Sequence, residues 1–468
     1  MKYGIIFFFF LWVSFFFLSC ENSRPKQKEV QTIVDSSYLK VKKRHTLIAA
    51  TNFSPINYFI YRGQTLGFEY EMLRKFAKYL DVDLEIQIIN DVDSAIYKVN
   101  RGEFDLIALG LTVTNDRKKK IHFSTPLLQT RQVLVQRKRP YKNTNDKYLQ
   151  NPLELDGKDI HILKNQMYRT HLEHLQEDIG IHFNILEHSD FSLEELIDSV
   201  AAGKFDYAVC DEHIAKAYQK FTTHIDLKTA LSLPQNIAWG LARDADSLHR
   251  HLNRWLETFQ KSRIAKNIYD KYFRFPLQQY ANQEFHSYKG NKISSYDAII
   301  RKAAKKIGWD WRLLAALIYQ ESKFNPSAKS WVGAFGLMQL MPQTAEDLGV
   351  DSLSSEMEQI FAGVQLLKTL DKQWKTRVKD SIERVNFVLA SYNVGMAHVL
   401  DARNLAQKYG KNANVWKDNV DVFLLNKSKP EFFQDPVVKY GYCRGSEPYH
   451  FVKEINARYF QYKTLISD

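Results

Sequence analysis

The sequence predicts a multidomain protein in which a two-lobed α/β domain is followed by a mainly α domain. Three observations predict this fold class. The chain has 468 residues, of which 45% are hydrophobic and 25% charged, so it resembles a folded protein too long for one hydrophobic core. Strand-like and helix-like segments alternate over residues 45–275, which indicates βαβ units around a largely parallel sheet. From residue 294 onward helical periodicity dominates.

The first twenty residues have a composition of their own. Lys2 precedes the apolar run GIIFFFFLWVSFFFLSC, which is short for a membrane span and ends abruptly, so residues 1–20 are predicted to be a signal peptide. The end of the run, Leu18-Ser19-Cys20, resembles the bacterial lipobox, with Phe17 in place of the usual aliphatic residue. The resemblance implies a lipoprotein anchored to the membrane through Cys20, and an uncleaved anchor or plain secretion is the alternative.

A short polar stretch separates this segment from the first domain. Residues 21–44 are polar and charged with no sustained period, and we expect a tether there. In the domain at 45–275 the sequence predicts strands at 46–52, 83–89, 104–111, 158–165 and 205–211, and helices at 67–82, 91–103 and 192–204. Two segments, NRGEFDLIALG and AAGKFDYAVCD, share a helix end, a glycine, Phe-Asp and a buried strand, which predicts two related lobes.

Three stretches of this domain carry a family resemblance. GFEYEMLRKFAKYL, RGEFDLIALGLTVTNDRKKKIHFSTPL and GKFDYAVCDEHIAKAY are similar to family-3 periplasmic solute-binding proteins. The resemblance implies that Arg117 holds the carboxylate of an amino-acid-like ligand and that Asp211 holds its amine. A guanidinium fork suits a carboxylate and an aspartate suits an ammonium group, whereas a solvated surface charge is the alternative for each residue.

The chain departs from this family at Asn165-Gln166-Met167. Solute-binding proteins of the family usually have a glycine and hydroxyl residues there, and these help to bind the carboxylate. A methionine side chain donates no hydrogen bond. The ligand of this domain is therefore either a free amino acid or a different or larger molecule such as a peptide, for example a muropeptide from the cell wall.

Residues 276–293 are predicted to be a linker, because most of them are polar and because the segment contains Pro276 and Gly290. The domain at 294–468 then shows helical periodicity at 295–308, 310–322, 342–349, 357–374, 381–393, 395–410 and 451–465. In the second of these helices, Leu314, Leu317, Ile318 and Glu321 share one face. An apolar face and the negative end of a helix both raise the pKa of a carboxyl group, although a glutamate that reaches solvent is the alternative.

The residues after this helix identify a second family. From Glu321 to Ala345 every specified position matches the signature E-S-x-F-x-P-x-A-x-S-x-x-G-A-x-G-L-M-Q-x-M-P-x-T-A of the soluble lytic transglycosylases. We expect Gly333 and Gly336 to allow close approach of a bulky ligand to the backbone. SYNVG matches the Y-N-x-G element of the family, and RGSEPYHFV resembles its closing E-x-x-x-Y-V element with Phe451 in place of tyrosine.

This resemblance implies a lysozyme-like fold and names the site residues. Glu321 would protonate the glycosidic oxygen between N-acetylmuramic acid and N-acetylglucosamine, and would then take a proton from the muramyl C6 hydroxyl, which closes a 1,6-anhydro ring. The substrate-binding residues implied are Ser330, Met338, Gln339, Tyr392, Asn393 and Glu447. Core packing is the alternative for Met338 and Tyr392, and a structural salt bridge is the alternative for Glu447.

A lipoprotein that joins both modules resembles the membrane-bound lytic transglycosylase F family. The expected function is cleavage of peptidoglycan glycan strands at the periplasmic face of the outer membrane, with regulation by a ligand of the first domain. The alternatives are a wall-binding sensor with an inactive lysozyme-like domain and a muramidase that uses water.

The net charge and the cysteines bear on which partners and cofactors the protein has. The formal charge of +12 favours an anionic partner, but no basic recognition helix or RNA-binding motif indicates nucleic acid. Cys210 and Cys443 are predicted to be buried thiols that form no disulfide, and no metal-ligand spacing surrounds either one. We therefore expect neither a metal nor a cofactor.

Overall fold

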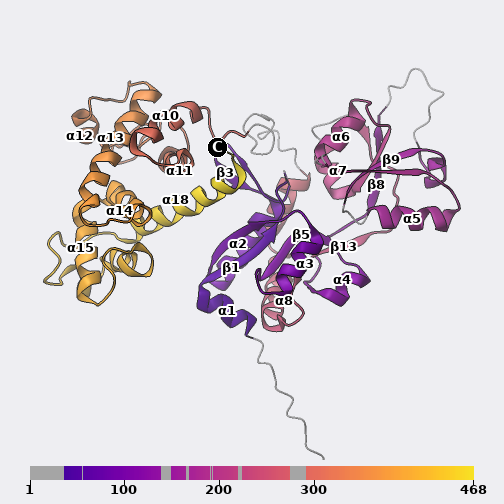
Figure 1. Ribbon diagram of the computed structural model, residues 1–468, viewed down its shortest axis with the longest axis horizontal. Coiled ribbons are helices and arrows are strands. Elements are labelled where there is room, and N and C mark those ends of the chain that lie inside the picture. Colours follow the sequence, from indigo (N-terminus) through magenta and orange to yellow (C-terminus); the bar gives the residue numbers. More distant parts are fainter. Residues whose placement is uncertain are drawn as a thin grey trace, which may run out of the picture. The chain divides into compact units, whose positions relative to one another are not determined.

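The computed structural model describes residues 36–54, 56–138, 149–164, 168–189, 191, 193–219, 224–274 and 291–467. The predicted signal peptide with Cys20 lies outside the described residues, as do Asn165-Gln166-Met167 and most of the predicted linker. The described part of the chain folds as a two-lobed α/β domain and a helical domain (Figure 1), as the sequence predicts.

The first lobe is built on one mixed sheet. Its strands are β1 (Thr46–Thr51), β4 (Asp83–Ile88), β5 (Leu106–Thr112), β6 (His122–Phe123), β7 (Leu128–Thr130) and β13 (Gln235–Leu241), in the order β4-β1-β5-β13-β6 with β7 beside β13. β1 pairs in parallel with β4 and β5, whereas β13 runs antiparallel to β5. The helical elements of this lobe are α2 (Phe68–Leu80), α3 (Val92–Asn100), α4 (Asn115–Lys120), α8 (Asp246–Phe259), α9 (Arg263–Tyr269) and the π-helical turn η2 (Asp270–Arg274).

The second lobe repeats this plan. Its strands are β8 (Gln132–Arg137), β9 (Asp159–Leu163), β10 (Asn184–His188), β11 (Tyr207–Asp211) and β12 (Ile225–Asp226), in the order β10-β9-β11-β8-β12. Its helical elements are η1 (Pro152–Leu155), α5 (Tyr168–Ile179), α6 (Leu193–Ala201) and α7 (Glu212–Gln219). The chain passes between the lobes at Arg131, between β7 and β8, and returns from β12 to β13.

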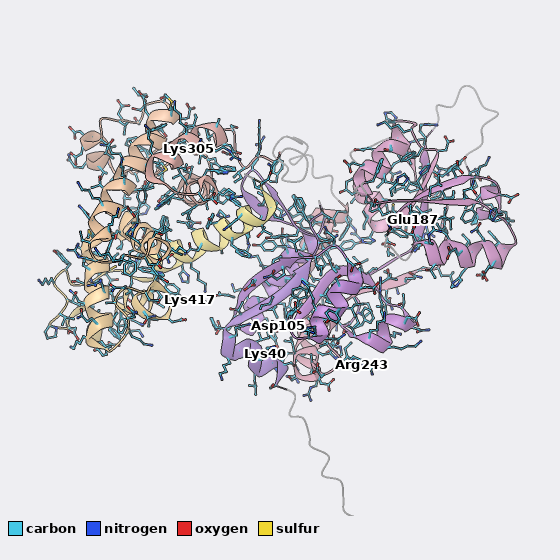
Figure 2. The ribbon with its side chains drawn as sticks, in the orientation of Figure 1. Lys40, Asp105, Glu187, Arg243, Lys305 and Lys417 are labelled. Carbon is cyan, nitrogen blue, oxygen red and sulfur yellow. The ribbon has the colours of Figure 1, made fainter. Side chains whose placement is uncertain are left out.

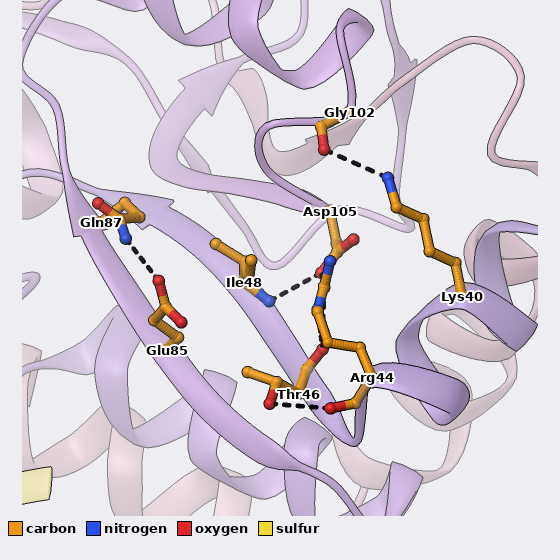
Figure 3. A network of polar contacts seen from close by, with 8 residues as sticks. All are labelled: Lys40, Arg44, Thr46, Ile48, Glu85, Gln87, Gly102 and Asp105. Atoms are coloured by element: carbon orange, nitrogen blue, oxygen red, sulfur yellow. Dashed lines mark hydrogen bonds and ion pairs between the residues drawn. The ribbon is translucent and has the colours of Figure 1, made fainter.

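The expected tether is shorter than the sequence indicates, because Ser37–Arg44 forms helix α1 on the first lobe. The guanidinium group of Arg44 forms an ion pair with Asp105, which also accepts a hydrogen bond of 2.8 Å from the Ile48 backbone (Figure 3). Lys40 Nζ donates to the Gly102 carbonyl at 3.3 Å, and Val41 is fully buried. Contacts with the rest of the lobe therefore fix this helix.

The helical domain contains every helix that the sequence predicts after residue 294, and short helices that it does not predict. Its elements are α10 (Asp297–Ile307), α11 (Trp311–Ser322), α12 (Pro342–Asp347), α13 (Glu356–Lys375), α14 (Ser381–Val394), α15 (Met396–Lys408), η5 (Trp416–Val420), α16 (Asp421–Asn426), α17 (Pro430–Phe433) and α18 (Ser446–Leu465). Helix α11 packs against α10 and α18, so a carboxylate at its end lies at the edge of the apolar core.

A hairpin in the first lobe meets the helical domain. Strands β2 (Phe59–Tyr61) and β3 (Gln64–Leu66) pair antiparallel around a turn at Arg62 and Gly63. The Thr65 hydroxyl is hydrogen bonded to the side-chain amide of Gln461 in α18. This hairpin is not predictable from the sequence, because two strands of three residues show too little periodicity.

Candidate active site in the helical domain

Helix α11 positions Glu321 in its last turn. The side chain of Asp310 caps the helix start by accepting a hydrogen bond of 2.9 Å from the Arg312 backbone. At the other end Lys323 and Phe324 have φ of +52° and +62°, so the chain turns sharply away after Ser322. Leu314, Leu317 and Ile318 are fully buried, which confirms the apolar face.

Glu321 is half-buried, and its pKa is raised from 4.5 to about 8. Burial is the main cause, because the charged carboxylate loses water, and the negative charge of Glu447 is the second cause. The expected direction of the shift is therefore confirmed. The second cause is a carboxylate from α18, and the sequence alone does not indicate its influence on Glu321. At neutral pH Glu321 is protonated and can act as an acid.

The signature residues after Glu321 fold into a compact meander. Lys329 and Leu340 both form β-bridges to Phe335, and the Ser330 to Gly333 turn is closed by a hydrogen bond of 3.0 Å from the Gly333 backbone to the Ser330 carbonyl. The Ser322 hydroxyl donates to the Leu337 carbonyl at 2.9 Å. This bond joins the end of α11 to the meander, so the signature holds the acid and the loop in one arrangement.

The two glycines of the meander have different roles. Gly336 has φ of +77°, and a Cβ atom there would collide with the side chain of Gln359 in α13. Gln359 itself accepts a hydrogen bond of 2.9 Å from the Leu337 backbone. Gly336 is therefore required by packing inside the protein, and the expected close approach of a ligand does not explain it. Gly333, with φ of +91°, is needed for the turn conformation.

Among the predicted substrate-binding residues of the meander, Gln339 and Ser330 keep polar atoms near the surface. Gln339 is half-buried, and its amide nitrogen donates to the carbonyls of Ala328 and Gly336 at 3.1 and 3.0 Å. Its amide oxygen is then oriented by the meander. The Ser330 hydroxyl accepts a bond of 2.9 Å from the Ala334 backbone and retains its own proton for donation. Met338, in contrast, is buried and packs against Gly363 of α13.

Helix α14 contributes the Y-N-x-G element. The Tyr392 hydroxyl donates to the Met338 carbonyl at 2.7 Å. Burial and the nearby Glu321 raise the pKa of Tyr392 well above its usual value, so the phenol stays protonated beside the acid. Asn393 is half-buried in the last turn of α14, which ends at Gly395 with φ of +86°. The structure thus brings together Glu321, Tyr392 and the backbone of the meander.

Helix α18 contributes Glu447 in its first turn, where it is exposed and its charge faces Glu321. Phe451 and Val452 lie one turn further on and are buried in the apolar core. The phenylalanine that replaces the family tyrosine is therefore a core residue in this chain. The sequence motif identified Glu447, but only the packing of α18 against α11 reveals that it acts on the pKa of Glu321.

The solute-binding-type domain has a second candidate site between its lobes. Arg117 lies in α4 of the first lobe, and its Nη1 donates to the Thr112 carbonyl at 3.1 Å. Asp211 ends β11 of the second lobe, where burial raises its pKa to about 6, while a hydrogen bond from Tyr168 and the charge of Arg117 oppose the shift. The two predicted residues therefore face each other across the lobes. Tyr168 is a further candidate that sequence reasoning missed.

Other predicted features are found within the described residues. Cys210 and Cys443 are free and buried, as expected. The described part of the chain contains no group of His, Cys, Asp and Glu side chains arranged to hold a metal ion. Among the residues with described structure, no helix combines the length and the apolar character that a membrane crossing needs.

Comparisons with known proteins give two family matches. Residues 46–275 match the family described as bacterial extracellular solute-binding proteins, family 3, and residues 298–415 match the transglycosylase SLT domain. The first domain also matches an ancestral arginine-binding protein bound to arginine, with 25% identity, a TM-score of 0.42 and coverage of 49% of this chain and 99% of that one.

Three relatives match along most of the chain, and each is named membrane-bound lytic murein transglycosylase F. The relative from Desulfosudis oleivorans is 32% identical, covering 90% of this chain and 91% of its own. The relative from Shewanella pealeana is 32% identical over 90% and 85% of the two chains, and that from Pseudomonas fluorescens Pf0-1 is 31% identical over 92% and 86%.

The fold and the site define a class of protein in which a family-3 solute-binding domain is joined to a transglycosylase SLT domain with an acidic glutamate. Similarity to relatives over 90% of the chain narrows the class further. The chain belongs to the membrane-bound lytic murein transglycosylase F family, and so to the lytic murein transglycosylases.

Proposed function

We propose that this protein cleaves the β-1,4 bond between N-acetylmuramic acid and N-acetylglucosamine in peptidoglycan and leaves 1,6-anhydromuramyl ends. The observation that carries the proposal is the half-buried carboxyl group of Glu321, with its raised pKa, within a complete transglycosylase signature. Glu321 gives its proton to the glycosidic oxygen as the C1–O bond breaks. The resulting carboxylate takes the proton of the muramyl C6 hydroxyl, whose oxygen attacks C1.

The neighbouring residues have supporting roles in this proposal. The amide oxygen of Gln339 would accept hydrogen bonds from the sugars, since the meander occupies its amide nitrogen. The Ser330 hydroxyl, which accepts a bond from the Ala334 backbone, would donate its proton to a sugar oxygen. Tyr392 and Asn393 would orient the saccharide beside Glu321. The Glu447 carboxylate adds to the effect of burial in raising the pKa of Glu321, and it would stabilise the positive charge that develops at C1.

The first domain is proposed to regulate the enzyme. Closure of the lobes around an amino-acid-like or muropeptide ligand, held by Arg117 and Asp211, would shift the population of active enzyme. Support comes from the β2–β3 hairpin, since this part of the first lobe contacts α18 and the end of α11. Lipidation of Cys20 at the periplasmic face of the outer membrane completes the proposal.

Digestion of purified sacculi tests the activity and its regulation together. Products are separated and weighed by mass spectrometry, with and without soluble muropeptides. We expect anhydro ends, and a change of rate with muropeptides. Reducing ends one water heavier would make the protein a hydrolase, and binding to sacculi without any released product would make it a wall-binding sensor.

A further inference from the structure

Helix α1 presents a cationic surface at the point where the chain enters the first lobe. Its eight residues, SYLKVKKR, include four lysines and arginines and no acidic residue. Lys40 and Lys43 are exposed, and Leu39 on the same helix has 61% of its surface exposed. Basic residues beside an exposed aliphatic side chain are typical of helices that lie on lipid headgroups.

Helix α8 extends this surface. The ring of Tyr38 stacks on His251 with 3.9 Å between the centroids, and the Ser37 and Ser247 hydroxyls are 2.9 Å apart. Arg250 and Arg254 are exposed on either side of His251 along the chain. Burial, followed by the charges of these two arginines, lowers the pKa of His251. His251 contacts α1 and also lies near Arg250 and Arg254, so the cations of α8 lie close to helix α1.

Helix α1 is attached to the first lobe by polar contacts. The Arg44 and Asp105 ion pair (Figure 3) and the bond from Lys42 Nζ to the Leu80 carbonyl, 2.7 Å long, fix α1 to the first lobe. Figure 2 labels Lys40 of this helix and Asp105 of the lobe. The acidic residues of α8 are Asp246 at its first residue and Glu257 in its last turn. We call the exposed cations of these two helices, Lys40, Lys43, Arg250 and Arg254, the α1–α8 surface. Helix α1 is thus already formed and attached to the lobe, so binding of an anionic partner carries no cost of ordering this segment.

We propose that the α1–α8 surface docks on the anionic phospholipid headgroups of the membrane that holds the protein. The inference rests in part on the proposed lipidation of Cys20. Ser36 follows Cys20 by 16 positions, and such a chain spans at most about 55 Å in any conformation. The anchor would thus keep the α1–α8 surface close to the headgroups, where lysine and arginine side chains add binding energy and Leu39 enters the interface.

The test uses the chain from Glu21 to Asp468, which keeps every described residue and lacks the lipid. Binding is measured by co-sedimentation with phosphatidylcholine vesicles that contain either no anionic lipid or roughly one third phosphatidylglycerol. We expect binding to the anionic vesicles only, with loss of binding when salt is raised from about 0.05 to 0.5 M. Binding to both vesicle types, or to neither, would overturn the proposal.

A matched pair of variants locates the surface. Replacing Lys40, Lys43, Arg250 and Arg254 by glutamine should weaken binding to anionic vesicles by about tenfold or more. The control replaces four exposed lysines of the helical domain by glutamine, namely Lys302, Lys305, Lys306 and Lys372, and so removes the same charge. We expect the control to bind like the parent. Equal loss in both variants would mean that net charge alone acts, and would overturn the proposal.

Further measurements separate a loss of lipid binding from unfolding of the variant, from binding to sacculi and from a missing lipid at Cys20. Thermal unfolding of both variants shows whether the fold is retained, and binding is compared only between variants that unfold like the parent. Purified sacculi replace vesicles in a parallel experiment, and binding to sacculi that depends on the same four residues, without binding to vesicles, would overturn the lipid assignment. Mass analysis of the N-terminus in cells tests Cys20 lipidation separately, because the vesicle experiment needs no lipid anchor.

Discussion

The hydroxyl of Tyr462, in the C-terminal helix α18, donates a hydrogen bond of 2.6 Å to the carbonyl oxygen of Gly63 at the tip of the β2–β3 hairpin. A Cβ atom on Gly63 would lie 2.8 Å from Tyr319 Cδ2 and 2.6 Å from Phe324 Cε2. Tyr319 and Phe324 stand on either side of Glu321 in the sequence. The hairpin of the first lobe therefore meets the segment that carries the acid.

This close approach leads to a prediction for Gly63→Ala. The new methyl group would overlap three aromatic side chains, and overpacking costs about 1–3 kcal/mol in addition to the cost of the left-handed conformation. We expect a lower free energy of unfolding in urea. Gly157→Ala is the matched control, since Gly157 has a similar φ of +69° against +75° and no atom within 4 Å of the added Cβ. Equal destabilisation of both variants would contradict the contact.

Replacing Glu321 by glutamine separates catalysis from stability. Glutamine has no acidic proton, so we expect no release of product from sacculi. Because the folded pKa of Glu321, about 8, exceeds its ordinary value of 4.5, folding takes up a proton between these values and stability falls as pH rises. Because glutamine does not ionise, Glu321→Gln removes this fall of stability with rising pH.

The stability measurement is a pH series of urea unfolding. The Glu321→Gln variant should be more stable than the parent at pH near 8, and this advantage should shrink toward pH near 5. Glu346→Gln, at an exposed position in α12, is the control and should follow the parent throughout. A Glu321→Gln variant that is less stable than the parent at the alkaline end would show that the carboxyl group is not enclosed.

Glu321 and Glu447 together determine the pH above which activity should fall. Activity should fall as pH rises through about 8, because Glu321 then loses the proton that it must donate. Glu447→Gln removes a negative charge that opposes this ionisation, so the pKa of Glu321 should fall and the limb should move to lower pH. The measurement is the initial rate of product release across pH. A limb that does not move would mean that Glu447 has no influence on the acid.

The sequence predicted those parts of the fold and site whose signal is local. The apolar face of α11 is periodic over the whole helix, and the meander follows from a long contiguous signature, so both were identified from residues close in the chain. The buried side chain of Met338 shows the limit of such reasoning. The signature specifies a methionine, whereas its environment depends on Gly363 in a helix that is remote in sequence.

Elements stabilised by distant partners were missed for the same reason. Helix α1 has one buried residue, Val41, and is fixed by Asp105 in another part of the lobe, so its own sequence resembles a polar tether. The role of Tyr168 beside Asp211 likewise depends on two segments that meet only in the folded lobe. Hydrophobic periodicity reports on one element at a time and carries no information on such pairs.

The proposed regulatory site predicts a variant that responds differently from the catalytic one. Arg117→Ala should abolish the effect of muropeptides on the rate and leave the basal rate near that of the parent, since Arg117 belongs to the first domain. Arg243→Ala, an exposed arginine of the same domain, is the control and should keep the response. Rates are measured on sacculi at increasing muropeptide concentration. If Arg117→Ala keeps the full response to muropeptides, Arg117 does not bind the ligand.

Two ion pairs of similar length provide the last prediction, because they differ in burial. Lys427 Nζ lies 2.6 Å from Asp401 Oδ2 with both side chains almost fully buried, whereas Lys119 Nζ lies 2.9 Å from Asp116 Oδ1 with 76% and 82% of the side chains exposed. Asp401 also accepts bonds from the Lys439 and Tyr440 backbones at 2.8 and 2.9 Å. It thereby fixes the segment that leads to Glu447.

Lys427→Met leaves the Asp401 charge buried without its partner, which costs about 3–5 kcal/mol. Lys119→Met breaks a solvated pair, so we expect no measurable loss of stability. Urea unfolding of the two variants measures the difference. The double variant Lys427→Met with Asp401→Asn should recover part of the loss, since the buried charge is gone while the amide oxygen can still accept a backbone bond. If the double variant is no more stable than Lys427→Met, the loss comes from the missing lysine packing and not from the unpaired charge.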